Sequence, residues 1–256
     1  MAKGMIGAQL YTLRDHCTTI EAIAETCRKV ADIGYTAVQI SGFGPADPKA
    51  VAAIMQDCNL TVASTHMGWE RFLKDLDGVI EEHKLWGCAH PAIGGLAGEY
   101  HSADGVKRFI DELGPVAERL AAEGMDFSYH NHNHELIRYG EKTWLAMLYE
   151  QASPDILKAE IDTYWITAGG GDPAAWVRTL GPRQPLLHCK DMAMAPGREQ
   201  RFAPVGEGNL NWPAILEAAQ EVGVEYYLVE QDLSYDLDPF EAMATSYRNL
   251  KGMGLS

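Results

Sequence analysis

The chain has 256 residues, of which 46% are hydrophobic and 22% charged, with a formal net charge of −15. This length allows a sizeable core in one large domain or two small ones. The acidic charge argues against nucleic acid and anionic membranes as partners, because phosphate groups are bound by basic surfaces. No apolar run is long enough to span a membrane. Five scattered cysteines without a CxxC pair, and an N-terminus without an apolar segment, favour a reduced protein of the cytoplasm.

Short apolar segments alternate with longer segments of helical period along the whole chain. The predicted strands, in chain order, are residues 5–10, 37–41, 61–66, 89–93, 126–130, 157–162, 185–190 and 226–230. The clearest predicted helices between them are residues 19–33, 106–123, 213–222 and 239–250. Gly34, Gly124 and Gly223 follow the first three of these helices, as expected where a helix ends.

Eight strands, each followed by a helix, correspond to about 32 residues per unit, which is typical of the (β/α)8 barrel. We therefore predict an α/β protein with a single TIM-barrel domain over residues 1–256. The alternative is an open doubly wound sheet. It is disfavoured because no G-x-G-x-x-G motif follows the first strand. The glycine cluster 169–171 comes late and leads into Asp172 and Pro173, so we interpret it as a loop before a helix.

Polar residues stand at the ends of the later predicted strands, where a TIM barrel has its active site. His66 ends the third strand, Asp162 the sixth, His188 the seventh and Glu230 the eighth. The fifth strand leads into the run His-Asn-His-Asn-His-Glu at residues 130–135. Buried imidazoles and carboxylates need a partner or a cation. A mixed set of this kind suits Mn²⁺, Mg²⁺ or Co²⁺, whereas Cys-rich or all-His sites favour zinc.

The fifth strand leaves two arrangements open. Side chains alternate along a strand, so if Phe127 and Tyr129 face the helices, His130 and His132 point into the barrel. Glu135 then reaches the interior only if the chain curls back after His132. Either Glu135 or His130 is therefore the metal ligand expected from this strand.

Three further residues are candidates for binding substrate. His66 lines the pocket or is a core histidine with a hydrogen-bond partner. Lys190 pairs with a substrate oxygen or with Asp191. Glu207, in a glycine-rich loop, reaches the site or lies in a surface turn. Three tryptophans are candidates for sugar-stacking walls, with core packing as the alternative: Trp69, Trp165 and Trp212.

Seven short motifs lie at the ends of the predicted strands and in the loops that follow them. They are GAQLY (residues 7–11), YHNHNHE (129–135), IDTYW (161–165), AGGGDP (168–173), HCKDM (188–192), VGEG (205–208) and VEQD (229–232). Together they resemble the sugar phosphate isomerase/epimerase family over nearly the whole chain. The fold implied by this resemblance is the xylose isomerase-like TIM barrel.

The resemblance implies a divalent metal, with Mn²⁺ expected and Mg²⁺ or Co²⁺ as alternatives. Carried over by motif, the metal ligands are Glu135, Asp162, His188 and Glu230. In related epimerases the two glutamates also move a proton on and off a carbon beside a carbonyl. Those epimerases carry the first glutamate within strand five, where this chain has His130. This departure favours the relatives that dehydrate inososes or process 3-keto sugars.

The leading functional prediction is a metal-dependent isomerase or epimerase acting on a keto sugar or related polyol. The metal would polarise the carbonyl and stabilise an enediolate, while Glu230, His130 or His132 removes the α-proton. If a β-hydroxyl or glycosyl group is lost instead, the enzyme is a lyase acting on an inosose or 3-keto-glycoside. An endonuclease IV-like DNA repair enzyme and a non-catalytic sugar-binding subunit are less favoured. Because related enzymes are often dimers or tetramers, a homo-oligomer is also expected.

Overall fold

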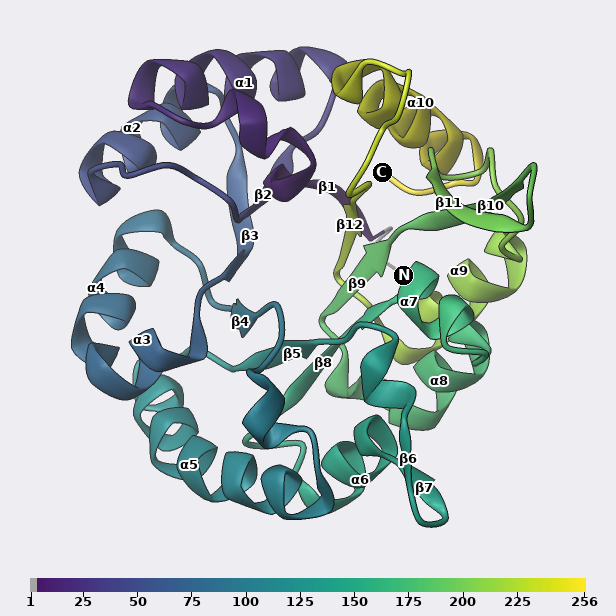
Figure 1. Ribbon diagram of the computed structural model, residues 1–256. Helices are drawn as coiled ribbons and strands as arrows, with labels where there is room; N and C mark the ends of the chain where they lie inside the picture. The colour runs from purple at the N-terminus through teal and green to yellow at the C-terminus, as the bar shows by residue number, and fades with distance from the viewer. Residues whose placement is uncertain (1–3) are drawn as a thin grey trace.

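Eight parallel strands form a closed barrel in the computed structural model, which describes residues 4–256 (Figure 1). The strands are β1 (Met5–Gln9), β2 (Ala37–Ile40), β3 (Thr61–His66), β4 (Pro91–Ile93), β5 (Ser128–His130), β8 (Lys158–Asp162), β9 (Leu186–Cys189) and β12 (Tyr226–Val229). The barrel closes where β1 pairs with β12, with Met5 opposite Tyr226. Each strand matches one predicted from the sequence, and the TIM-barrel fold is confirmed. The first three residues of the N-terminal segment considered above lie outside the described residues.

The helices form a ring around the barrel (Figure 1). They are α1 (Ile20–Ile33), α2 (Pro48–Asp57), α3 (Trp69–Lys74), α4 (Leu76–Trp86), α5 (Ala103–Ala121), α6 (Trp144–Gln151), α7 (Thr163–Ala168), α8 (Pro173–Leu180), α9 (Trp212–Val222) and α10 (Pro239–Gly252). Local sequence explains their ends: in α1 the Thr19 side chain accepts a hydrogen bond from the Ala22 amide, and Gly34 follows with φ of +120°. No helix within residues 4–256 is both long and apolar enough to cross a membrane.

The apolar core lies between the barrel and the helix ring. Phe127, just before β5, and Tyr129 on β5 face this core and are buried against aromatic side chains of the helices. The centroid of the Phe127 ring lies 5.7 Å from that of Trp69, so Trp69 is a packing residue. Burial of each such ring contributes about 2–3 kcal/mol to stability. The same alternation sends Ser128 and His130 into the barrel, as predicted.

A layer of buried polar side chains fills the barrel interior below the strand ends. Gln39 Nε2 donates to Ser64 Oγ (3.0 Å) and to Glu160 Oε1 (2.7 Å), and Gln39 Oε1 accepts from Gln9 Nε2 (2.5 Å). All four side chains are fully buried. Because each polar side-chain atom of these four residues has a partner, the layer that they form is compatible with burial and provides a fixed base for the residues above it.

Two small antiparallel sheets stand outside the barrel: β6 (Arg138–Tyr139) with β7 (Lys142–Thr143), and β10 (Asp191–Ala195) with β11 (Glu199–Ala203). The second pair forms a hairpin next to β9 (Figure 1). At its base the buried Asp191 accepts hydrogen bonds from the amides of Gly206 (2.8 Å) and Gly208 (3.1 Å). Trp212 Nε1 also donates to Asp191, at 2.6 Å, so Trp212 has a structural role. A Cβ on Gly208 would lie 2.3 Å from Asp191 Oδ1, which explains the glycine there.

Candidate active site

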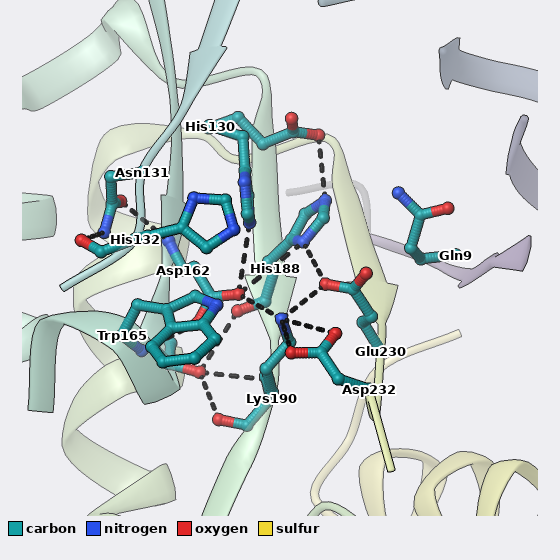
Figure 2. Close-up of polar contacts among 12 residues, drawn as sticks. Gln9, His130, Asn131, His132, Asp162, Trp165, His188, Lys190, Glu230 and Asp232 are labelled. Atoms are coloured by element: carbon teal, nitrogen blue, oxygen red, sulfur yellow. Dashed lines mark hydrogen bonds and ion pairs between the residues drawn. The ribbon is translucent and has the colours of Figure 1, made fainter. Parts of the chain in front are cut away.

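Four buried side chains meet at the carboxyl end of the barrel: His130 from β5, Asp162 from β8, His188 from β9 and Glu230 just after β12 (Figure 2). One donor atom from each lies within 4.8 Å of the donor atoms of the other three. His130 Nε2 is 3.2 Å from Asp162 Oδ2. His188 Nδ1 is 3.0 Å from Glu230 Oε2 and 3.8 Å from Asp162 Oδ2. We call this group the barrel cluster.

Glu135 does not join the barrel cluster. It lies in a short 3-10 helix, η3 (His134–Leu136), and its Oε1 accepts from the Tyr129 hydroxyl at 2.8 Å. Its Oε2 accepts from the His132 amide, also at 2.8 Å. Since Tyr129 faces the helix ring, the curl after His132 carries Glu135 to the outer side of β5. The expected set with Glu135 is therefore not brought together, and His130 takes that corner.

Lys190 is buried beside the barrel cluster and pairs with its carboxylates (Figure 2). Its Nζ lies 3.0 Å from Asp162 Oδ2, 2.7 Å from Glu230 Oε2 and 3.2 Å from Asp232 Oδ1. Burial alone would lower the pKa of Lys190, but these three carboxylates hold it above the usual value. The side chain is therefore an ammonium ion. Its predicted alternative partner, Asp191, is occupied instead by backbone amides and a tryptophan.

The layer below orients the His188 ring. His188 Nε2 lies 2.7 Å from Gln39 Oε1 and 3.2 Å from Glu160 Oε1, which are both acceptors. Nε2 therefore carries a hydrogen, and Nδ1 faces Asp162 and Glu230. Burial would lower the pKa of His188, but Glu160 and Glu230 outweigh it and hold this pKa well above its usual value. A cation bound at Nδ1 would take the place of the proton.

Glu160 is a site residue that sequence reasoning missed. Besides its contacts with Gln39 and His188, its Oε2 accepts from His66 Nε2 at 2.7 Å. It stands two residues before Asp162 on β8 and so points to the same side of the sheet. That parity was the available signal, but Glu160 is inside the strand and not at its end.

His130 and His132 are uncharged imidazoles. Burial, with a further contribution from His188, lowers the pKa of His130 to about 4. Burial, reinforced by His130 and Lys190, lowers the pKa of His132 to about 2. Neutral imidazole is the form that binds metal or accepts a proton, so both histidines are in the state that such roles need.

The donor set of the barrel cluster fits a divalent metal. Two imidazole nitrogens and two carboxylate oxygens converge from four strands, and Asp162 and Glu230 are both held ionised. Burial would raise both carboxyl pKa values, but Lys190 and nearby imidazoles lower them. Two imidazoles shift the preference from Mg²⁺ towards transition ions such as Mn²⁺ and Co²⁺. Lys190 shares these carboxylates and so competes with a metal for their charge.

A cavity of about 750 Å³ opens onto the barrel cluster. Lys190, Glu230, His66 and His132 contribute to its lining. Phe202 of the β10–β11 hairpin forms part of the wall, and its ring centroid is 5.7 Å from that of Trp165, which also lines the cavity. Among the candidate tryptophans, Trp165 is therefore the one that faces this space.

Glu207 lies elsewhere. Its side chain is exposed, and its Oε1 accepts from Asn249 Nδ2 of α10 at 3.0 Å. It is absent from the residues that line the cavity in the described part of the chain. Glu207 therefore lies in a surface turn, which was one of the two positions that the sequence left open.

Residues 27–251 match the sequence model of the xylose isomerase-like TIM barrel family. The chain belongs to this family. The match spans most of the barrel, including all four residues of the barrel cluster.

Two curated proteins and one solved structure illustrate the range of xylose isomerase-like relatives. The rhizopine catabolism protein MocC of Rhizobium meliloti is 22% identical over 253 residues, covering 85% of this chain and 75% of MocC. An inosose dehydratase of Geobacillus kaustophilus is 23% identical over 203 residues, covering 70% of this chain but only 64% of the dehydratase. A sugar phosphate isomerase/epimerase from Parabacteroides distasonis has a TM-score of 0.80 at 22% identity, covering 99% of this chain and 96% of its own. At this identity the structural likeness establishes the fold.

Proposed function

We propose that this xylose isomerase-like protein is a divalent-metal-dependent enzyme of the isomerase/epimerase type. Its substrate would be a keto sugar or related polyol, from which it removes a proton beside the carbonyl. The observation that carries the proposal is the barrel cluster, with Lys190 against it, at the base of a cavity of about 750 Å³. That volume lies within the range of small-molecule sites, and Trp165 offers an aromatic face for a sugar ring.

The metal would be held by His130 Nε2, Asp162 Oδ2, His188 Nδ1 and Glu230 Oε2, with Mn²⁺ or Co²⁺ as the favoured ion. When bound, it supplies Lewis-acid polarisation of the substrate carbonyl and its neighbouring hydroxyl. Removal and return of the proton are carried out by side chains of the chain itself.

Glu230 is the favoured base. Lys190 and His188 keep its pKa below the usual value despite burial, so it is a carboxylate at neutral pH. His132 also lines the cavity as a neutral imidazole and is the second candidate to accept or return a proton. The Lys190 ammonium donates to an oxygen on which negative charge develops as the proton leaves. Return of the proton to another carbon or face completes isomerisation or epimerisation.

A lyase acting on an inosose or 3-keto-glycoside is the second candidate. The observation in its favour is that His130, with no carboxylate beside it on β5, stands opposite Glu230. Without a carboxylate on β5, the site lacks the pair of glutamates from β5 and the end of β12 used for two-base epimerisation. The adjacent Lys190 ammonium could instead protonate a departing hydroxyl or glycosyl oxygen. The proton removal that begins this path is the same.

Deuterium exchange from solvent tests the shared step. The protein, loaded with Mn²⁺ or Co²⁺, would be incubated in D₂O with a panel of ketoses, inososes and 3-keto-glycosides and followed by NMR. We expect exchange at the carbon beside the carbonyl of at least one compound, and a loss of about 10²-fold or more in Glu230→Gln. Glu207→Gln is the matched control, because Glu207 lies outside the cavity. A lack of exchange across the panel would overturn the proposal, and a dehydrated or cleaved product would select the lyase.

A further inference from the structure

A second cluster of ligand atoms lies beyond the barrel cluster, between the loops that follow β4 and β5. It consists of His101, His134 and Glu135, each of which offers one donor atom within 4.8 Å of the others. His101 follows the 3-10 helix η2 (Gly98–Tyr100), whereas His134 and Glu135 begin η3. The ring centroids of the two histidines are 4.5 Å apart. Two loops distant in sequence thus bring two imidazoles to one buried carboxylate.

The two imidazole nitrogens of this cluster have unmet hydrogen-bonding capacity. His101 Nε2 and His134 Nε2 are both buried, and neither has a hydrogen-bond partner among the described residues. His134 Nε2 lies 3.2 Å from Glu135 Oε1, yet the pair lacks the angles of a hydrogen bond. Buried polar atoms are almost always paired, so two unpaired nitrogens beside one carboxylate call for a missing partner that all three can share.

Glu135 is held ready for such a partner. Each oxygen of the Glu135 carboxylate accepts one hydrogen bond: Oε1 from the Tyr129 hydroxyl and Oε2 from the His132 amide. Each oxygen keeps a further lone pair. Within residues 4–256, no lysine or arginine forms an ion pair with this carboxylate, although its residue is only 1% exposed. A buried carboxylate with this environment needs positive charge, and the tyrosine and backbone amide orient it as outer-shell partners orient a metal ligand.

We propose that His101 Nε2, His134 Nε2 and the Glu135 carboxylate form a second metal site, which takes Zn²⁺ or Co²⁺. Two imidazoles and one glutamate are a recurrent ligand set for Zn²⁺, and they leave a fourth position for water. Two ligands that are each about 2.0–2.1 Å from a tetrahedral ion lie about 3.3 Å apart. The 3.2 Å between His134 Nε2 and Glu135 Oε1 matches that spacing. Mg²⁺ and Ca²⁺ prefer oxygen ligands and do not suit this set.

An ion at this position would join the loop after β4 to the loop after β5. It would thereby stiffen the run 130–135, of which His130, His132 and His134 line the cavity. The His132 ring stacks on the His134 ring, with centroids 5.5 Å apart and planes inclined by 16°. The site is separate from the barrel cluster and does not depend on the proposed reaction.

Metal stoichiometry tests this site without reference to activity. The full-length protein would be stripped with a chelator, loaded with Co²⁺ and dialysed, with bound metal measured by mass spectrometry and by visible absorption. We expect two ions per chain in the wild type and one in His134→Ala, with loss of one component of the absorption spectrum. His16→Ala is the matched control, because it removes an exposed histidine and should keep both ions.

The double variant Asp162→Asn/Glu230→Gln separates this proposal from the proposed function, because it should lose the barrel ion and keep the second one. Glu135→Gln retains an acceptor for the Tyr129 hydroxyl and should weaken Co²⁺ binding at the second site at least tenfold. Circular dichroism would establish that each variant is folded. Equal metal content in wild type and His134→Ala, or complete loss of metal in the double variant, would overturn the second site.

Discussion

The Lys190 ammonium group forms an ion pair with the Glu230 carboxylate, with 2.7 Å between Nζ and Oε2. The same nitrogen lies 3.0 Å from Asp162, so one buried cation serves two carboxylates of the barrel cluster. A metal at the cluster and the Lys190 ammonium therefore draw on the same negative charge. Under the proposed function, Lys190 is therefore expected to influence metal affinity as well as to donate a proton.

Lys190→Met should bind divalent metal at least tenfold more tightly than the wild type, a change of about 1.4 kcal/mol. The substitution keeps the buried aliphatic volume but removes a positive charge from the cluster. The metal-free variant should lose about 3–5 kcal/mol of unfolding free energy, because two buried carboxylates lose their partner. Calorimetric titration with Mn²⁺ and urea unfolding measure the two effects. Unchanged or weaker Mn²⁺ binding would show that the ammonium and the metal do not compete.

His130→Glu should change which metal the barrel cluster prefers. A carboxylate at this position replaces an imidazole nitrogen with oxygen, which favours Mg²⁺ and Mn²⁺ relative to Co²⁺. We expect the ratio of Co²⁺ to Mg²⁺ affinity to fall by about tenfold or more. Competition titrations give this ratio directly. His130→Leu, which removes the imidazole without supplying an oxygen ligand, is the control, and an equal fall in both variants would contradict the explanation by ligand type.

The barrel and most of its strand ends could be predicted from the sequence, because apolar segments with helices between them leave few other arrangements. Asp162, His188 and Glu230 could be predicted as site residues for a similar reason, because each stands where an apolar strand ends. Glu135 was not, since its position depends on a 3-10 turn whose hydrogen bonds to Tyr129 and the His132 amide have no signature in strand alternation.

The polar layer inside the barrel was also beyond sequence reasoning. Gln39 and Glu160 come from strands 121 residues apart, and only closure of the barrel reveals that they meet. Glu207 shows a second limit of sequence reasoning, because a glycine-rich loop near a strand end is compatible with either a pocket or a surface position. Its hydrogen bond to Asn249 of α10, which is distant in sequence, decides the matter.

Glu160→Gln should weaken metal binding at the barrel cluster by about 10- to 100-fold, as loss of an outer-shell partner commonly does. The neutral amide no longer balances the hydrogens donated by His66 and His188, so the His188 ring loses its fixed orientation. Isothermal titration with Mn²⁺ measures the effect. Ser64→Ala removes another polar atom of the same layer without touching His188 and should leave Mn²⁺ affinity within about threefold of the wild type. Similar losses in both variants would indicate a general disturbance of the layer.

His83 should make stability depend on pH. Its ring is fully buried, with Nδ1 donating to the Val79 carbonyl (2.7 Å) and Nε2 accepting from the Thr65 hydroxyl (2.8 Å). Burial lowers the pKa of His83 below its usual value. The unfolded chain therefore binds a proton below about pH 6.5 that the folded protein does not, and the unfolding free energy falls as the pH is lowered through that value.

His83→Gln tests this assignment, since glutamine has no titrating group. Urea unfolding from pH 8 to pH 5 should give a shallower fall in the variant, whereas above pH 7 the two curves should run parallel. The variant should be less stable throughout, by about 1–3 kcal/mol, because one buried hydrogen bond is poorly replaced. An identical slope in both proteins below pH 6.5 would assign the pH dependence to other groups.

The β10–β11 hairpin pairs with no strand of the barrel, yet its Phe202 forms part of the cavity wall. Its base is anchored through Asp191, outside the barrel cluster. Substitution of Phe202 would therefore reshape the cavity wall while the register of the eight-stranded sheet and the barrel cluster stay in place. One part of the cavity wall and the residues of the barrel cluster thus lie in different stretches of the chain, so the shape of the cavity can change by substitution in a single hairpin.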